Sequence, residues 1–155
     1  MLAVLLTLLA NFSQAVLPFP TMPDPRLTAG SLCQNPIEIR YPERIKYCGR
    51  DVSSSEKQMI IQLYERKGGY QINKYGRENF KIDHLVPLCM GGSNEANNLW
   101  PQHKTVYVYT DPLESLGCQK LAQGRVRQAD IIQLLFMAKR NPAISQQIFQ
   151  RMSAL

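Results

Sequence analysis

The chain has 155 residues, of which 45% are hydrophobic, and 18 Lys and Arg against 12 Asp and Glu give a formal net charge of +6. This length fits one domain, and the sequence shows no repeat, coiled-coil heptad or long apolar run beyond its N-terminus, which excludes solenoids, coiled coils and multispanning membrane proteins. A small protein this basic is attracted to polyanions, so nucleic acid, anionic lipid and acidic glycans are the partner classes to consider.

Residues 1–15, MLAVLLTLLANFSQA, form an apolar segment without a charged side chain. The segment is shorter than the about 20 residues that span a bilayer, and the small residues Ser13 and Ala15 suit signal-peptide cleavage after Ala15. The n-region lacks Lys and Arg, which leaves an uncleaved anchor or a wrongly assigned start as the alternatives. We therefore expect a secreted or periplasmic protein whose mature form is not attached to a membrane.

Prolines dominate the start of the mature chain. Residues 16–36 contain Pro18, Pro20, Pro23, Pro25 and Pro36. Because proline fixes φ and lacks a backbone donor, we expect an extended proline-rich arm here. The remaining residues, 37–155, are predicted to form a single folded domain.

Helical periodicity accounts for much of that domain. Ser53 and Glu56 fit a capping box ahead of an apolar helical pattern, which Gly68 and Gly69 end. Further helices are predicted at three places: 105–123, which Gly124 ends, about 127–140, and the C-terminus beyond Asn141–Pro142.

Two short strands are predicted on either side of a glycine turn. The segment 82–88 is β-prone, 91–94 (GGSN) is turn sequence, and 98–100 is a second strand that Pro101 ends. The polar segment 70–81 is predicted to be a loop that leads into the first strand. With the helix that follows, these elements make an α+β domain with a ββα unit at about 80–123.

All four cysteines, Cys33, Cys48, Cys89 and Cys118, lie in the mature chain. An even number in an exported chain favours disulfides, and the absence of C-x-x-C spacing argues against a zinc knuckle. Three pairings can be drawn, and the sequence does not choose among them. Cys33–Cys48 is the natural local pair, which leaves Cys89–Cys118 to tie the glycine-turn region to the following helix.

The segment 80–103, FKIDHLVPLCMGGSNEANNLWPQH, holds both histidines and the only tryptophan of the chain. Its strings DHLVPL (83–88), GGSN (91–94) and NLWP (98–101) agree in residue type and spacing with one family. The chain resembles the HNH endonucleases of the ββα-metal superfamily, especially the small exported bacterial type. A looser similarity extends to residues outside this core: Tyr47-Cys48, Val52, Asp111, Leu113-Glu114 and Gly124.

The resemblance implies a ββα-metal core with flanking helices, and it assigns roles to three residues. A neutral imidazole near pH 7 can take a proton from water, so His84 is expected to be the general base. Asp83 is expected to hold a divalent ion against the scissile phosphate, Mg²⁺ in the first place and Mn²⁺ or Zn²⁺ as alternatives. Adjacent strand residues point to opposite faces, so the family implies a bend that brings both side chains to one site. Asn98 is expected to brace the loop between the strands and to help orient the base.

The third HNH position is where the sequence departs from the family. The family places a metal-binding His or Asn about nine residues after the Asn, and Tyr107 stands there. We expect His103 to be the second metal ligand, with Glu114 as the competing candidate and a surface His103 that binds no metal as the remaining alternative. Cys118 would serve as a thiolate ligand for a softer metal only if it were not disulfide-bonded.

Basic residues flank the motif. Lys74, Arg77, Lys81 and Lys104 are expected to contact a phosphate backbone, although a solvated basic loop explains them equally well. Trp100 is expected in the core. The sequence contains no recognisable sequence-reading module, so contact with nucleic acid is expected to be nonspecific.

The sequence therefore predicts an exported, monomeric, metal-dependent endonuclease that cleaves DNA, with RNA as a further substrate. One alternative is a secreted basic protein that binds nucleic acid without cleaving it. The other is a nuclease toxin or effector delivered into another cell, which would be accompanied by an immunity protein.

Overall fold

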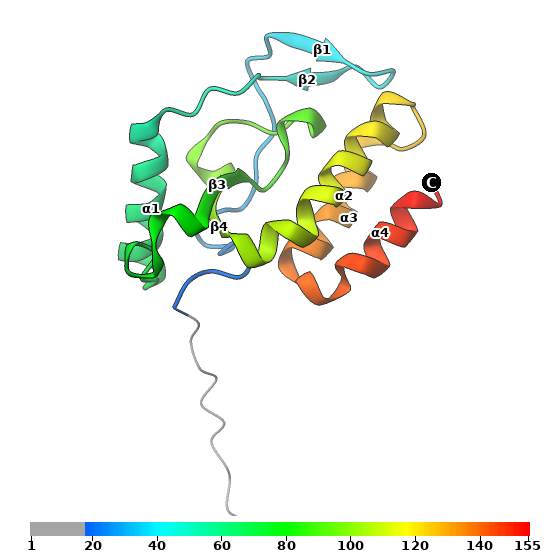
Figure 1. Ribbon diagram of the computed structural model, residues 1–155. Helices are drawn as coiled ribbons and strands as arrows, with labels where there is room; N and C mark the ends of the chain where they lie inside the picture. The colour runs from blue at the N-terminus through cyan, green and yellow to red at the C-terminus, as the bar shows by residue number, and fades with distance from the viewer. Residues whose placement is uncertain (1–17) are drawn as a thin grey trace, which may run out of the picture.

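The computed structural model describes residues 18–155, so the expected signal peptide at 1–15 lies outside the described residues. Within residues 18–155 the chain is α+β, with four α-helices and two two-stranded antiparallel sheets (Figure 1). The elements in chain order are β1 (Glu38–Arg40), β2 (Ile45–Tyr47), α1 (Ser54–Gly68), β3 (Phe80–His84), β4 (Leu99–His103), α2 (Lys104–Ala122), α3 (Gln128–Arg140) and α4 (Ser145–Ser153). The α+β prediction is confirmed.

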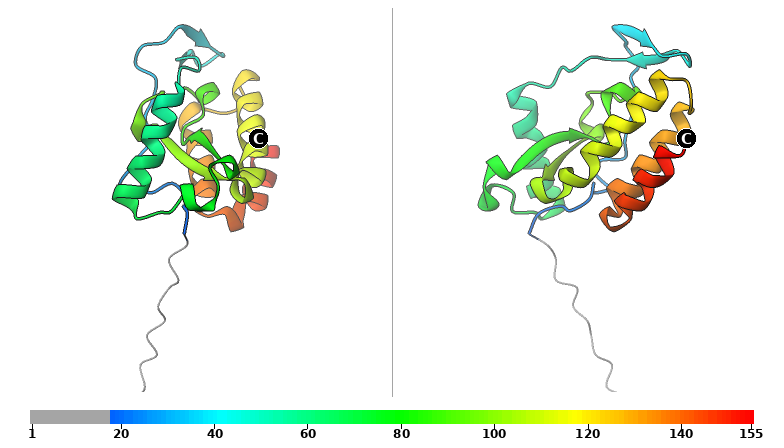
Figure 2. Two further views of the ribbon diagram at one scale, coloured as in Figure 1. Left: turned by 60° about the vertical axis from the view of Figure 1, so that its left-hand side comes forward. Right: turned by 45° about the vertical axis from the view of Figure 1, so that its right-hand side comes forward.

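The β3–β4 hairpin lies between α1 and a layer of three helices. Helix α1 packs against β4, while α2, α3 and α4 pack against one another on the other side (Figures 1 and 2). One apolar cluster fills the three-helix layer and includes Leu113 and Leu135. A second cluster joins α1 to the hairpin and includes Tyr64 and Trp100, both fully buried. Trp100 is therefore a core residue, as expected.

Helix α1 begins and ends where the sequence predicts. The Ser53 hydroxyl accepts a hydrogen bond from the backbone N–H of Glu56, and the Glu56 carboxylate accepts one from the backbone N–H of Ser53, which completes the capping box. Gly69 ends the helix at φ 76°, a left-handed conformation that costs glycine little. The three further predicted helices are confirmed as α2, α3 and α4.

The strands differ from their predicted bounds. β3 ends at His84, earlier than predicted, because the chain then turns into a short 3-10 segment at Leu88–Met90. β4 continues through Pro101 to His103, so the prediction that Pro101 ends the strand is wrong. Each strand of a two-stranded sheet has a free edge, and a proline whose nitrogen faces that edge removes no ladder hydrogen bond.

The β1–β2 hairpin was not predicted. Its turn places Tyr41 and Arg44 at φ 63° and 62°, where glycine or asparagine is usual. The segment therefore lacks the turn residues by which a hairpin is recognised in a sequence.

The proline-rich segment packs on the domain instead of extending away from it. Gly30 donates a backbone hydrogen bond to Asn97 at 2.9 Å, and Cys33 donates one to Gly91 at 2.8 Å. The buried hydroxyl of Thr28 donates to the Leu99 carbonyl at 2.9 Å. The arm thus covers the loop that joins β3 to β4.

Two disulfides hold the fold, with the pairing that sequence neighbourhood favours. Cys33 is bonded to Cys48, and Cys89 is bonded to Cys118. The first fastens the arm to the segment after β2, and the second fastens the 3-10 segment after β3 to α2. Two disulfides are typical of proteins that fold outside the reducing cytosol. Over residues 18–155, none of the helices has both the length and the apolar character needed to cross a bilayer.

Candidate active site

The loop between β3 and β4 folds back on itself at the paired glycines. A Cβ on Gly92 would lie 1.8 Å from the carbonyl oxygen of Val86, so no other residue fits this position. Gly91 has φ 84°, which also favours glycine. This close approach of backbone to backbone is the physical reason for the paired glycine of the motif.

Asn98 braces the same loop from inside. Its Oδ1 accepts from the Val86 N–H at 2.9 Å, and its Nδ2 donates to the carbonyls of Val86 at 3.0 Å and Ser93 at 2.8 Å. The side chain is fully buried. Asn98 therefore fixes both ends of the turn that follows His84, which is the bracing position expected for it.

His84 is held by a residue of the glycine turn. The Nε2 atom of His84 lies 3.0 Å from Oδ1 of Asn94, and Nδ2 of Asn94 donates to the Gly49 carbonyl at 3.0 Å. Because the contact with Gly49 uses the amide nitrogen, the amide oxygen faces His84, and Nε2 must carry the proton. The lone pair of the neutral imidazole is then on Nδ1.

The surroundings of His84 favour its neutral form. Burial lowers the pKa of His84, and the nearby positive charges of Arg50 and Lys139 act in the same direction. The side chain is 3% exposed. Among the described residues Nδ1 has no hydrogen-bond partner, yet it is not sealed from solvent. The surroundings thus favour an uncharged imidazole, and its Nδ1 has no hydrogen-bond partner among the described residues.

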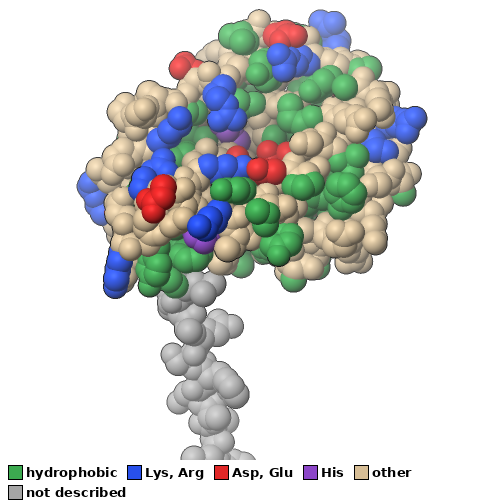
Figure 3. Space-filling model, viewed as in Figure 1, with side chains coloured by type: hydrophobic (Ala, Val, Ile, Leu, Met, Phe, Trp, Pro, Cys, Tyr) green, Lys and Arg blue, Asp and Glu red, His purple; other side chains and the backbone are tan. Residues whose placement is uncertain are grey.

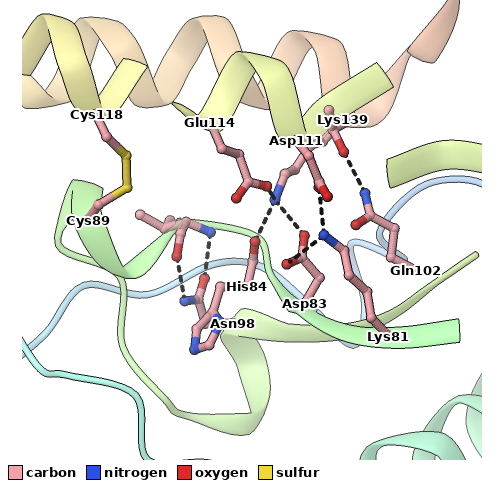
Figure 4. A network of polar contacts seen from close by, with 12 residues as sticks. Lys81, Asp83, His84, Cys89, Asn98, Gln102, Asp111, Glu114, Cys118 and Lys139 are labelled. Carbon is pink, nitrogen blue, oxygen red and sulfur yellow. Dashed lines mark hydrogen bonds and ion pairs between the residues drawn. A yellow bond between two sulfur atoms is a disulfide. The ribbon is translucent and has the colours of Figure 1, made fainter. Parts of the chain in front are cut away.

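Asp83 points away from this imidazole. The ladder pairs Asp83 with Trp100 and His84 with Leu99 without interruption, so the alternation of side chains is kept. In Figure 4 the Asp83 carboxylate faces Lys139, whereas the imidazole lies on the side of Asn98. The expected bend that would bring Asp83 and His84 to one site is not present.

The Asp83 carboxylate belongs to a buried network of charges. Its Oδ2 lies 3.1 Å from Nζ of Lys139, and its Oδ1 lies 3.6 Å from Nζ of Lys81. Burial alone would raise the pKa of Asp83, but the two ammonium groups hold it below its usual range. Lys81 also forms an ion pair with Asp111 at 2.6 Å. Asp83 is therefore an ionised, fully paired carboxylate.

Lys139 connects this carboxylate to helix α2. Its ammonium lies 2.6 Å from Oε1 of Glu114 and donates a hydrogen bond to the carbonyl of His84 at 2.5 Å. The side chain is 0% exposed. Burial raises the pKa of Glu114 to about 7, although Lys139 opposes the shift. Burial alone would lower the pKa of Lys139, but the carboxylates of Asp83 and Glu114 hold it above its ordinary value.

His103 is not brought to Asp83. It pairs with Phe80, three residues along the ladder from the Asp83–Trp100 pair, which is about 10 Å at 3.3 Å per residue. Its ring stacks on Phe19 with centroids 4.2 Å apart, and its Nδ1 accepts from the Thr105 N–H at the start of α2. His103 therefore does not lie beside Asp83 in this structure, and it serves instead as the N-cap of α2 at the other end of the hairpin.

Of the remaining candidates for the third HNH position, two have other contacts and one approaches Asp83. Tyr107 lies under the ammonium of Lys81, 5.0 Å from the ring centroid. Cys118 is disulfide-bonded, which removes it as a thiolate ligand. Glu114 is the candidate that does approach Asp83, through Lys139.

These residues do not fit a divalent ion as they are arranged. Asp83, the expected metal ligand, and Glu114, the alternative to His103 for the second position, do converge, but both face the ammonium of Lys139. A metal ion bound to the same oxygens would lie against a buried positive charge, and such repulsion is strong in a medium of low dielectric. Within the described part of the chain, no group of three or more His, Cys, Asp and Glu side chains is placed to hold a metal.

The basic residues named from the sequence have different surroundings. Lys74 and Lys104 are exposed, whereas Arg77 donates to the carbonyl of Phe80 and Lys81 is engaged by two carboxylates. On the face shown in Figure 3, small patches of histidine are visible between Lys and Arg side chains. Lys74 and Lys104 are thus free to meet a phosphate, while Arg77 and Lys81 have structural partners.

Comparison of the chain with protein-family models, with curated proteins and with solved structures finds no match.

Three residues of the site were missed from the sequence. From the sequence, Asn94 is predicted only as a turn residue, although an amide in the loop after a histidine is a natural orienting partner. Arg50 lies next to Gly49, and only the fold brings this segment to His84. Lys139 did leave a signal, because it follows Ile131 and Leu135 at four-residue spacing on the buried face of α3.

Proposed function

We propose that the chain is an HNH-type endonuclease that hydrolyses phosphodiester bonds, with His84 as the base that activates water. One observation carries the proposal: the imidazole of His84 lies in surroundings that favour its neutral form, is fixed through Nε2 by Asn94, and has no partner at Nδ1 among the described residues. A general base needs these three properties together. The DHLVPL, GGSN and NLWP strings add the resemblance to the HNH family.

The chain's own residues supply the parts of the reaction as follows. Nδ1 of His84 takes a proton from water as the water attacks phosphorus, and Asn94 Oδ1 stabilises the imidazolium that forms. Arg50 is exposed and close enough to act electrostatically on His84, so it is placed to offset the charge of the phosphate. The exposed lysines Lys74 and Lys104 add contacts to phosphate without reading bases, so we propose low sequence specificity for DNA and for RNA.

We also propose that the protein is exported and acts outside the cytosol as a monomer. The two disulfides and the apolar leader at 1–15 support this location. A toxin or effector that enters another cell would use the same chemistry, and copurification of an immunity protein would identify it.

A nicking assay on supercoiled plasmid tests the activity. His84→Ala in the mature chain is expected to lower the rate by about 10²- to 10⁴-fold, the usual contribution of a general base. The matched control is His103→Ala, which removes the only other histidine and leaves His84 untouched. Cleavage by His84→Ala within a few-fold of the wild type would refute the assignment. A wild type that binds DNA in fluorescence anisotropy but never cuts it would establish the noncatalytic alternative.

A further inference from the structure

A fully buried lysine joins three elements directly beside the proposed base. Lys139 comes from α3, Glu114 from α2, and Asp83 and His84 from β3 (Figure 4). Lysine is almost never fully buried unless it is paired, and nothing in the proposed reaction uses this one. Its position therefore needs a separate explanation.

The ammonium donates hydrogen bonds to Asp83 and to the carbonyl of His84, and it forms an ion pair with Glu114. It has three donors, and three oxygens surround it: Oδ2 of Asp83 at 3.1 Å, Oε1 of Glu114 at 2.6 Å and the carbonyl of His84 at 2.5 Å. Two of these oxygens belong to carboxylates. An oxygen set of this composition is the kind that hard divalent ions also select.

We propose that Lys139 is a built-in cation, in the place where the HNH resemblance puts a divalent ion. Its ammonium neutralises Asp83 and Glu114 and fixes the backbone carbonyl of His84, so that α2, α3 and the strand carrying the base are held together without a metal. Only the link to the base rests on the proposed nuclease function. The placement of Lys139 at the cation position does not depend on that function.

Lys139 is a positioning residue in this scheme, because a side chain that is 0% exposed does not reach a substrate. The proposal has a consequence that a purely structural lysine would not have. Removal of the ammonium leaves two carboxylates and a carbonyl facing one vacated position, and such a set binds Mg²⁺ or Mn²⁺. In the wild type, in contrast, one oxygen of each carboxylate faces the ammonium of Lys139.

Electron paramagnetic resonance of Mn²⁺ tests this consequence without any cleavage assay. The mature chain, stripped with EDTA, is titrated with Mn²⁺ as the wild type, as Lys139→Ala and as the double variant Asp83→Asn/Lys139→Ala. We expect Lys139→Ala to bind Mn²⁺ at least about tenfold more tightly than the wild type, and the double variant to lose this gain. The matched control is Lys120→Ala, which removes another buried lysine, bonded to the Ser153 carbonyl at 2.9 Å and remote from Asp83 in its contacts.

The outcomes separate this proposal from the nuclease assignment. Wild-type protein that binds Mn²⁺ tightly, with the binding lost in Asp83→Asn, would overturn the role of Lys139 and leave the nuclease proposal standing. If Lys139→Ala unfolds in EDTA, restoration of its circular dichroism by Mn²⁺ supports the proposal, and failure of Mn²⁺ to restore it overturns the proposal. Plasmid cleavage by the wild type is expected to persist in EDTA. If the wild type cleaves DNA and EDTA abolishes this cleavage, the proposal that Lys139 supports His84 without a metal is contradicted. If the wild type does not cleave DNA at all, only the nuclease function is contradicted.

Discussion

Nε2 of His84 lies 3.0 Å from Oδ1 of Asn94, and this contact decides which nitrogen of the imidazole carries the proton. The amide cannot turn over without losing its own hydrogen bond to the Gly49 carbonyl. The glycine turn thus does more than reverse the chain, since it delivers the residue that orients the base. The segment that contains Gly49 and Arg50 becomes part of the site through the same amide.

Asn94→Ala should therefore lower cleavage without unfolding the protein. A hydrogen bond to a group that becomes charged contributes about 1.5–3 kcal/mol, which corresponds to about ten- to a hundredfold in rate. Single-turnover rates on a labelled duplex measure the loss. Glu95→Ala alters the next residue, which is exposed, and serves as the control. Equal rates for Asn94→Ala and Glu95→Ala would remove Asn94 from the mechanism.

The pH dependence of cleavage should reflect the lowered pKa of His84. Burial disfavours the imidazolium, so the neutral base persists below the ordinary pKa of 6.5, and the acid limb of the rate profile should lie below pH 6.5. His103→Gln leaves His84 as the only histidine, so that one imidazole signal in the proton NMR spectrum reports its titration. Because the Asn94 bond favours the charged form, Asn94→Ala should move this titration to still lower pH. A midpoint above pH 6.5 would contradict the burial argument.

The sequence predicted the parts of the site that depend on local spacing. Local spacing predicts Asn98 and the paired glycines, and it also predicts the cap of α1. Each depends on short segments of sequence in which neighbouring backbone atoms set the geometry. What the sequence could not supply was the direction in which Asp83 and His84 point, because the family's bend was assumed and the ladder here continues straight. Lys139 could have been noticed as a charged residue on an apolar helix face, but its partners come from β3 and α2, 25 to 56 residues away. Such contacts are tertiary, and no local pattern encodes them.

Glu114→Gln should change how stability depends on pH. Burial raises the pKa of Glu114 in the folded state to about 7 from its ordinary 4.5, so between these values the folded state binds more protons than the unfolded state. Stability from this group therefore falls as the pH rises from about 4.5 to 7. Glutamine does not titrate. Over this pH interval the free energy of unfolding of the variant should therefore rise relative to that of the wild type by up to roughly 3 kcal/mol, at about 1.36 kcal/mol per pKa unit.

Urea unfolding at pH 5 and pH 8 measures the difference for both proteins. The carboxyls outside the group of Asp83, Glu114 and Lys139 are common to the two chains and cancel. Glu95→Gln, which replaces an exposed carboxyl, provides the control. Its stability relative to the wild type should not change between pH 5 and pH 8. A Glu114→Gln protein that follows the wild-type curve at both pH values would show that Glu114 titrates normally.

Gly92→Ala should destabilise the loop that holds both Asn94 and Asn98. The new methyl group would lie 1.8 Å from the carbonyl oxygen of Val86, which is backbone and cannot swing aside. We expect a loss of about 3 kcal/mol or more in the free energy of unfolding. Gly69→Ala is the matched control, because its φ of 76° is also positive but nothing lies within 4 Å of the added Cβ. Its cost should stay near 1 kcal/mol, the usual penalty for a left-handed alanine.

The Cys89–Cys118 disulfide should stabilise the site as well as the fold. It closes a loop of 29 residues and fastens α2, which carries Glu114, to the segment that follows His84. The chain-entropy estimate for this loop is roughly 3–4 kcal/mol, so the double variant Cys89→Ser/Cys118→Ser should unfold at a clearly lower temperature and should cleave more slowly. The variant Cys33→Ser/Cys48→Ser opens a loop of 15 residues and should lose roughly 3 kcal/mol. Mass spectrometry of the oxidised wild type without reductant checks the premise, since two disulfides leave no thiol for alkylation, and four alkylated cysteines would refute both bonds.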